Sequence, residues 1–158
     1  MLNVDLGALP LRDLLTLRAA VDAEISKRGY SRTSSSLAGE LMERTVATSY
    51  SGTLTGVGTK SVDIIAGDGR RLQVKARSLP HGDLRHWAFH DLDFDAAVVV
   101  SVNRDSFAIN WARELSQTEA TALARPHKSD KWRVRMAAAQ HTVVDVTQRL
   151  QLAYSKLW

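Results

Sequence analysis

An almost unbroken apolar run, DAAVVVSV, occupies residues 95 to 102 of this 158-residue chain. A strand that is apolar at consecutive positions, rather than at every second one, is typical of the centre of a sheet buried on both faces. The segment SFAINWAR follows after the short polar connection NRD, so it is expected to be a neighbouring strand. These residues predict the middle of a β-sheet that other elements must cover.

Two helices are predicted before the sheet. Apolar residues recur at helical spacing between residues 9 and 28, with Pro10 in the first turn and Gly29 as the stop: Leu11, Leu14, Leu15, Leu17, Val21 and Ile25. The last serines of SRTSSS, residues 31 to 36, can cap a second helix that runs from Leu37 to about Tyr50. The first helix is expected to be amphipathic.

The segments after the central strands predict more helix. Residues 114 to 124 are expected to be helical, WRVRM is expected to be a short edge strand, and a closing helix is marked by Val146, Leu150, Ala153 and Leu157. The order of elements predicts an α/β fold, with a mixed central β-sheet flanked by helices. We expect a single domain over residues 1–158, with an N-terminal helical arm at 1–30 and a core at 36–158.

Composition narrows the class of protein. With 44% hydrophobic and 24% charged residues the chain is typical of a globular protein, and it has no apolar stretch long enough to span a membrane. The absence of cysteine excludes disulfides, thiolate zinc sites and cysteine nucleophiles. The start, MLNVDLGALPLRD, lacks a basic segment followed by an apolar block, so we expect a cytoplasmic protein. A formal charge of +4 favours a polyanionic partner such as nucleic acid.

Residues 61 to 77, SVDIIAGDGRRLQVKAR, predict a β-hairpin whose register follows from its apolar residues. A two-residue turn on DG would mix polar and apolar side chains on both faces. A three-residue loop, GDG, instead sets Ile64 opposite Leu72 and Val62 opposite Val74, so that four apolar side chains share one face. We therefore expect the longer loop.

The other face of this hairpin gathers Asp63, Gln73 and Lys75, because strand side chains alternate between faces. In the preceding helix, Glu43 lies one turn beyond Gly39, a residue that lets another backbone come close. Two interpretations are open at this point. The strand residues are either ordinary solvated side chains or part of a functional site.

The arrangement of GELME on a helix, then Asp63, then QVK on the following strand resembles the PD-(D/E)xK nuclease superfamily, which includes restriction endonucleases and archaeal-type Holliday junction resolvases. The resemblance covers residues 39 to 77, fits the later strands loosely, and leaves the N-terminal helix outside the αβββαβ core. It implies a restriction-endonuclease-like fold and a metal-dependent DNA endonuclease, a hydrolase acting in restriction or defence. Mg²⁺ is the implied cofactor, with Mn²⁺ as an alternative ion.

The resemblance also implies roles for individual residues. Asp63 matches the first metal-binding carboxylate, Lys75 the catalytic lysine and Glu43 the helix glutamate. Gln73 stands where Asp or Glu is usual, and such a Q-x-K variant is similar to Mrr-like and modification-dependent restriction enzymes. The amide oxygen of Gln73 and the carbonyl of Val74 would be further metal ligands, although they add no negative charge.

Four basic residues surround the hairpin, and their functional interpretation is contact with DNA phosphates: Lys60, Arg70, Arg71 and Arg77. Arg70 and Arg71 can equally form a solvated basic edge that prevents aggregation. Small nucleases commonly act as dimers, so we expect a homodimer, with the helix of residues 9 to 28 able to supply the contact. No membrane partner and no small-molecule cofactor are expected.

Other interpretations stay open at this stage. The chain could be a Holliday-junction or repair nuclease, a DNA-binding module of the same fold that has lost catalysis, or a structural partner in a larger complex. Three histidines, His81, His86 and His90, lie near several aspartates but match no compact zinc pattern, and their role is not assigned. The target sequence, the choice between DNA and RNA as the nucleic acid, and the dependence on base modification are also left open.

Overall fold

The structure of the protein is a computed structural model, which describes residues 4–32, 36–59 and 61–157. The chain divides into two compact units, residues 1–34 and 35–158, and each is described by itself. Among the described residues, no helix is both long enough and apolar enough to cross a bilayer.

The first unit contains a short 3₁₀ turn, η1 (Leu6–Ala8), and the helix α1 (Leu11–Lys27). The predicted stop is confirmed, since Gly29 has φ of +77° and the Tyr30 amide donates to the Ile25 carbonyl at 3.2 Å, as in a Schellman cap. No residue of α1 is buried, and Leu11 is 71% exposed. The apolar stripe of this helix is therefore exposed within its own unit.

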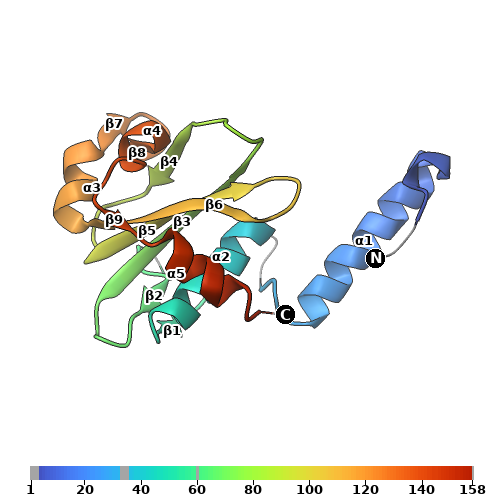
Figure 1. Cartoon of the computed structure of the whole chain (residues 1–158), viewed down its shortest axis with the longest axis horizontal. Helices are drawn as coiled ribbons and strands as arrows, with labels where there is room; N and C mark the ends of the chain where they lie inside the picture. Colours follow the sequence, from blue (N-terminus) through green and yellow to red (C-terminus); the bar gives the residue numbers. More distant parts are fainter. Residues whose placement is uncertain (1–3, 33–35, 60, 158) are drawn as a thin grey trace. The chain divides into compact units, whose positions relative to one another are not determined.

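The second unit is built on a six-stranded mixed sheet with the order β1-β2-β3-β5-β6-β9 (Figure 1). Only the β3–β5 pair is parallel among these strands. The expected fold class is confirmed in this mixed α/β form. The strands are β1 (Thr53–Leu54), β2 (Ile64–Ile65), β3 (Arg71–Leu79), β5 (Ala96–Asn103), β6 (Ile109–Ser116) and β9 (Val144–Asp145).

The apolar run is the centre of the sheet, as predicted. Every residue of β5 from Ala96 to Val102 is buried, and β6 pairs with it in antiparallel fashion. On one face lie α2 (Leu37–Ser49) and α5 (Thr147–Tyr154), which Figure 1 shows side by side. The Ser36 hydroxyl accepts from the Gly39 amide, so the expected serine cap of α2 is confirmed.

A second sheet, which the sequence did not indicate, covers the opposite face of β5. It has three strands in the order β4-β8-β7: β4 (His86–Phe89), β8 (Lys131–Arg135) and β7 (Arg125–His127). Trp87, Phe89 and Val134 of this sheet form one apolar cluster with Ala97 and Val99 of β5. The WRVRM segment is therefore the middle strand of a small sheet, so its assignment as an edge strand was wrong.

Two short helices complete the unit. The helix expected over residues 114 to 124 begins later, as α3 (Gln117–Leu123), because residues up to Ser116 belong to β6. Ser116 and Glu119 form a capping box at its start. A four-residue helix, α4 (Met136–Ala139), follows β8, and its Met136 and Ala139 are buried.

The hairpin has the predicted register. Ile64 lies opposite Leu72 in antiparallel pairing, and both are fully buried. The Ala66 amide donates to the Arg70 carbonyl at 2.9 Å, which closes the loop over the three residues GDG. Gly69 has φ of +86°, a conformation that explains why glycine ends this loop.

Candidate functional site

The carboxylate of Asp63 lies where β2 separates from β3. The Asp63 amide still donates to the Leu72 carbonyl at 2.9 Å, which extends the ladder by one residue. Its Oδ2 then accepts two hydrogen bonds, from Gln73 Nε2 at 2.5 Å and from the Val74 amide at 2.7 Å. The Asp63 carboxylate thus takes the place of a backbone carbonyl as acceptor for the Val74 amide, and the side chain is held against β3.

Gln73 and Lys75 lie on the face of β3 that the second sheet covers. Their parallel partners are Ala97 and Val99, which belong to the cluster beneath β4 and β8. Gln73 is only 8% exposed and Lys75 is half-buried. The interpretation of these residues as a solvated hairpin face was therefore wrong.

Lys75 is a half-buried amine that three acids influence electrostatically. Its Nζ lies 5.3 Å from the centre of the Phe89 ring, within range of a cation–π contact. Burial lowers the pKa of Lys75 below its ordinary value of 10.5, and the negative charges of Asp63, Asp91 and Glu43 oppose this shift without cancelling it. Three carboxylates from three separate segments thus act on one ammonium group.

Asp91 is a site residue that the sequence alone did not single out. It follows β4 in the chain and accepts a hydrogen bond from the hydroxyl of Ser61, just before β2. Hydrogen bonds from Ser61 and from the Asp93 amide lower its pKa, so it stays ionised at neutral pH. The second sheet brings this loop to the hairpin. No local sequence pattern predicted that contact.

The helix α2 contributes Glu43, which is half-buried and close enough to affect Lys75. One turn earlier the same helix carries Glu40, which is only 7% exposed and was not anticipated. The close approach expected at Gly39 is not seen among the described residues, where a Cβ built at Gly39 would have the Ser36 Cβ, at 3.8 Å, as its nearest neighbour. The close approach occurs at Gly52, where a Cβ would lie 2.7 Å from the Ile65 carbonyl oxygen.

The predicted phosphate-binding residues have partners inside the protein. Arg77 donates to the His86 carbonyl at 2.7 Å, and Arg71 pairs with Asp93 and Asp95. Lys60 lies outside the described residues. These contacts give Arg71 and Arg77 structural roles whether or not they also meet DNA.

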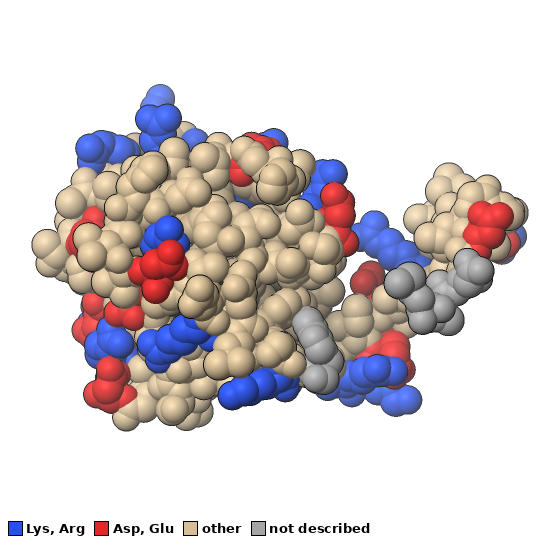
Figure 2. Space-filling model, viewed as in Figure 1, with Lys and Arg blue, Asp and Glu red and all other residues tan. Residues whose placement is uncertain are grey.

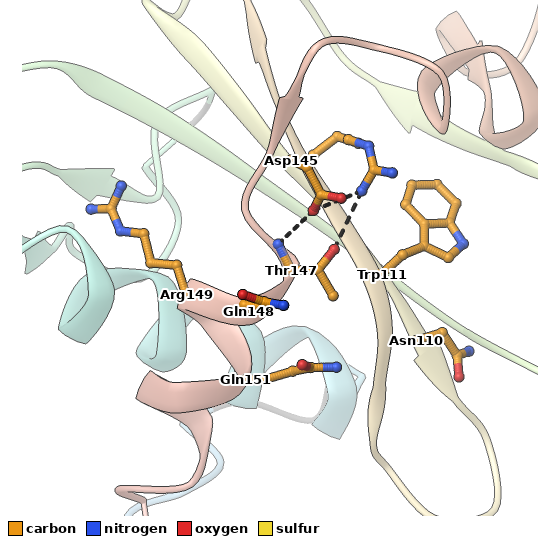
Figure 3. Close-up of a pocket in the computed structure, with 8 residues that line it drawn as sticks. Asn110, Trp111, Asp145, Thr147, Gln148, Arg149 and Gln151 are labelled. Carbon is orange, nitrogen blue, oxygen red and sulfur yellow. Dashed lines mark hydrogen bonds and ion pairs between the residues drawn. The ribbon is translucent and has the colours of Figure 1, made fainter.

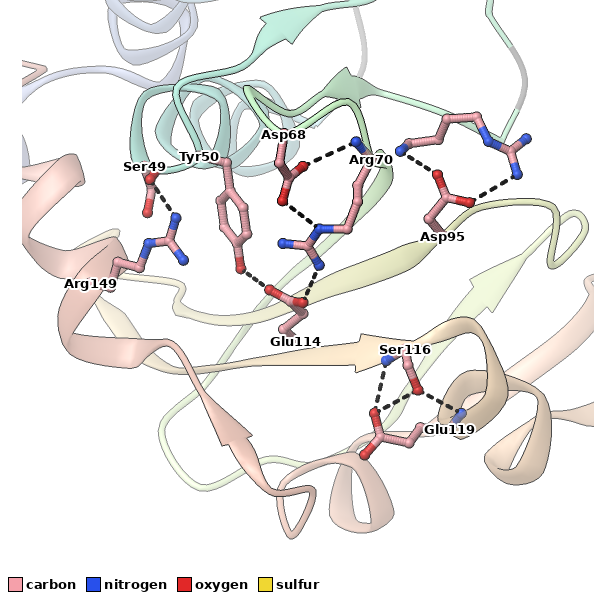
Figure 4. A network of polar contacts seen from close by, with 10 residues as sticks. Ser49, Tyr50, Asp68, Arg70, Asp95, Glu114, Ser116, Glu119 and Arg149 are labelled. Carbon is pink, nitrogen blue, oxygen red and sulfur yellow. Dashed lines mark hydrogen bonds and ion pairs between the residues drawn. The ribbon is translucent and has the colours of Figure 1, made fainter.

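Arg70 belongs to a polar network that joins four elements (Figure 4). Its Nη1 donates to Glu114 of β6 at 2.5 Å, and the Tyr50 hydroxyl at the end of α2 donates to the other oxygen of the same carboxylate at 2.6 Å. The guanidinium of Arg149, on α5, lies 3.9 Å from the centre of the Tyr50 ring. The network links the hairpin loop to the helices and the sheet.

The donor atoms around Asp63 are of the kind that a hard cation takes. Two carboxylates, Asp63 and Glu43, are accompanied by the Gln73 amide oxygen and the Val74 carbonyl, and all of these are oxygen ligands suited to Mg²⁺. Within the described ranges, no three histidine or acidic side chains converge as a metal cluster. The set therefore fits Mg²⁺ in chemistry, with only two negative charges to hold it.

A surface hollow among the described residues lies elsewhere. It has a volume of about 710 Å³ and is formed by β6, β9 and the start of α5, with Trp111 and the Arg113–Asp145 ion pair among its walls (Figure 3). None of the predicted site residues lines it. Its contents are amides, a hydroxyl and an ion pair already satisfied at 3.0 Å, which do not form a nucleophilic or acid–base set.

No protein-family model matches this chain, and no curated protein matches it.

Proposed function

We propose that this protein is a Mg²⁺-dependent DNA endonuclease that resembles the PD-(D/E)xK class. One observation carries the proposal: a half-buried lysine with a lowered pKa lies among three carboxylates at the point where two strands separate. Buried ionisable groups with opposing charges are typical of catalytic sites. The order of these residues along the chain is also the order that the family resemblance requires.

The residues would divide the work of phosphodiester hydrolysis. A bound Mg²⁺ supplies a more acidic water and stabilises negative charge on phosphate oxygens. Asp63, Glu43, the Gln73 amide oxygen and the Val74 carbonyl would hold the ion. Lys75 would orient the attacking water and accept its proton, since burial makes its neutral form more accessible than that of an exposed lysine. Its protonated form would then stabilise charge on the phosphate.

Plasmid cleavage tests the proposal directly. Supercoiled DNA is incubated with the protein and Mg²⁺, Mn²⁺, Ca²⁺ or EDTA, and nicked and linear products are measured. Asp63→Ala and Lys75→Ala should each lower the rate at least about 100-fold. Asp93→Ala is a matched control, because Asp93 is exposed, its carboxylate pairs with Arg71, and alanine keeps the backbone amide that donates to Asp91. Parental rates in the Asp63 and Lys75 variants would show that the site is misassigned.

The choice of substrate separates the related nuclease functions. Plain duplex, methylated duplex and four-way junctions of equal length should be compared at the same enzyme concentration. A restriction or defence enzyme should prefer one of the duplexes, whereas a junction or repair nuclease should cut the four-way or damaged form faster. The resemblance favours the duplex result.

One observation favours a second candidate, a DNA-binding module without catalysis. Gln73 and the Val74 amide already occupy Asp63 Oδ2, so the hairpin is closed without any cation. Titration calorimetry with Mg²⁺ and Mn²⁺, beside the plasmid assay, distinguishes the two candidates. DNA binding with no uptake of metal and no nicking would support the module.

We also infer that the active form is a homodimer. A single site per chain cuts one strand, so cleavage of both strands at one place needs two copies. The exposed apolar stripe of α1, including Leu11 and Leu15, offers a contact surface. Replacing both with Gln should yield monomers in analytical ultracentrifugation, and the yield of linear product should fall more than that of nicked product.

A further inference from the structure

The outward face of the second sheet is basic along the whole of its central strand. Trp132 and Val134 of β8 point toward the apolar cluster. Because strand side chains alternate, the outward positions are those of Lys131, Arg133 and Arg135. No outward position of β8 carries an apolar or acidic side chain.

The neighbouring strands add Arg and His side chains to this face. Each outward residue of β8 lies opposite one of them, in the pairs Arg133–Arg125, Lys131–His127 and Arg135–His86. Arg133 and Arg125 both carry a positive charge, and side chains of like charge directly opposite each other destabilise a sheet. A carboxylate opposite Arg133 would be more stable there, so the pattern indicates a negatively charged ligand.

The net positive charge of the chain is concentrated in residues 125 to 135, which form β7, β8 and the turn between them. Residues 125 to 135 contain five Lys and Arg and one Asp, a net charge of +4, which equals the formal charge of the whole protein. The remaining residues balance 16 basic against 16 acidic side chains. In Figure 2, Lys and Arg side chains gather at the upper left, over the part of the molecule where Figure 1 labels α4, β7 and β8.

Little of this charge is neutralised inside the protein. Asp130 pairs with Arg133 and lies 3.9 Å from His86 and 3.6 Å from His127. Within the part of the chain that the structure describes, Lys128, Lys131 and Arg135 have no carboxylate at ion-pair distance. In contrast, Arg70 and Arg71 of the hairpin are paired with acids.

The basic face ends beside the candidate site. Lys131 Nζ lies 3.3 Å from His90 Nε2. The next residue in the chain, Asp91, is one of the three carboxylates that act on Lys75. A polyanion that follows the outward face of β8 thus meets the edge of the site at this end of the sheet.

We propose that the outward face of the β4-β8-β7 sheet binds the sugar–phosphate backbone of duplex DNA and directs it to the Asp63–Lys75 site. The choice of DNA as the polyanion rests on the proposed function. A membrane surface fits less well, because docking there also needs apolar side chains to insert, and the outward positions of β4 and β8 carry Ala88 as their only apolar residue. Contacts of this kind give affinity and position without reading the base sequence.

The test is DNA binding measured without cleavage. Fluorescence anisotropy of a labelled duplex is followed in EDTA at several salt concentrations, with the parent and with the triple variant Lys128→Gln, Lys131→Gln, Arg135→Gln. We expect affinity to fall at least about 10-fold near 0.15 M salt, and the slope of log K against log salt to decrease by about 2 to 3. The replaced side chains are exposed, so the fold should be retained, which circular dichroism checks.

A second triple variant of the same charge, Arg12→Gln, Arg104→Gln, Lys156→Gln, is the control, since its residues are exposed and outside the second sheet. Equal losses in both triple variants, or parental affinity in the first, would overturn the proposal. So would loss of binding to anionic vesicles of phosphatidylserine and phosphatidylcholine with unchanged binding to DNA. Because no metal is present, the result is independent of catalysis, so a loss of binding in the first triple variant would stand even if the plasmid assay showed no cleavage.

Discussion

Gln73 donates its side-chain amide to Oδ2 of Asp63 at 2.5 Å, so a neutral side chain stabilises this carboxylate through a hydrogen bond. A second carboxylate at this separation would repel Asp63 unless a cation lay between them. The dependence of hairpin stability on a cation should therefore be set by residue 73.

Replacing Gln73 by an acid should make the stability of the fold depend on Mg²⁺. Gln73→Glu removes the amide donor and adds a negative charge beside Asp63, so the melting temperature without metal should fall by several degrees, as a loss of about 1 to 2 kcal/mol would produce. Addition of Mg²⁺ should recover more stability in this variant than in the parent, because two acids bind the ion more tightly. Thermal unfolding in EDTA and in Mg²⁺ measures both effects, and Gln73→Met, which adds no charge, is the control.

Lys75 should give the stability of the protein a distinctive pH dependence. Its folded pKa lies below 10.5, so between the two values the unfolded chain binds more protons and stability rises with pH. Below the folded value, the full penalty of burying the ammonium group is present. In Lys75→Met this rise should be absent, so the parent should gain stability relative to the variant as the pH rises from the lowered pKa of Lys75 toward 10.5. Urea unfolding across this range compares them, and parallel curves would contradict a buried titrating lysine.

The Tyr50–Glu114 hydrogen bond should stabilise the junction of α2 and β6. Tyr50→Phe removes the hydroxyl donor at 2.6 Å and leaves one carboxylate oxygen, in a largely buried side chain, with less compensation. We expect a loss of about 1 to 2 kcal/mol in the free energy of unfolding. A double-mutant cycle with Glu114→Gln isolates the pair, and a coupling energy near zero would show that the loss arises elsewhere.

Alanine substitutions at two glycines should have opposite effects on the stability of the protein. In Gly52→Ala the new Cβ would lie 2.7 Å from the Ile65 carbonyl oxygen and 2.8 Å from the Ile64 side chain, so the strand must move, at a cost of about 1 to 3 kcal/mol. Gly39→Ala, within α2, should raise stability by about 0.5 to 1 kcal/mol, since the new Cβ meets no atom of the described residues closer than 3.8 Å and alanine favours helix. Chemical denaturation measures both variants, and a destabilised Gly39→Ala would mean that α2 is constrained there after all.

The elements that the sequence predicted well are those whose pattern is local. The apolar run that became β5, the spacing of leucines in α1, the serine before α2 and the alternation across the hairpin each depend on neighbours within a few residues. Burial of one hairpin face was enough to choose the three-residue loop, because a shift of one residue would exchange the faces. The presence of Asp63, Gln73 and Lys75 on one side followed from the same reasoning.

Features that depend on contacts between distant segments could not be predicted from the sequence and are seen only in the tertiary structure. The second sheet joins β4 to strands some forty residues later, and only this pairing buries Gln73, places Asp91 beside Lys75 and aligns the basic residues of β7 and β8. Short strands with mixed polar and apolar residues have no period strong enough to reveal a partner that far along the chain. The amino-acid sequence alone therefore determined which side chains share the hairpin face, whereas their burial and charged surroundings depended on which elements packed over it.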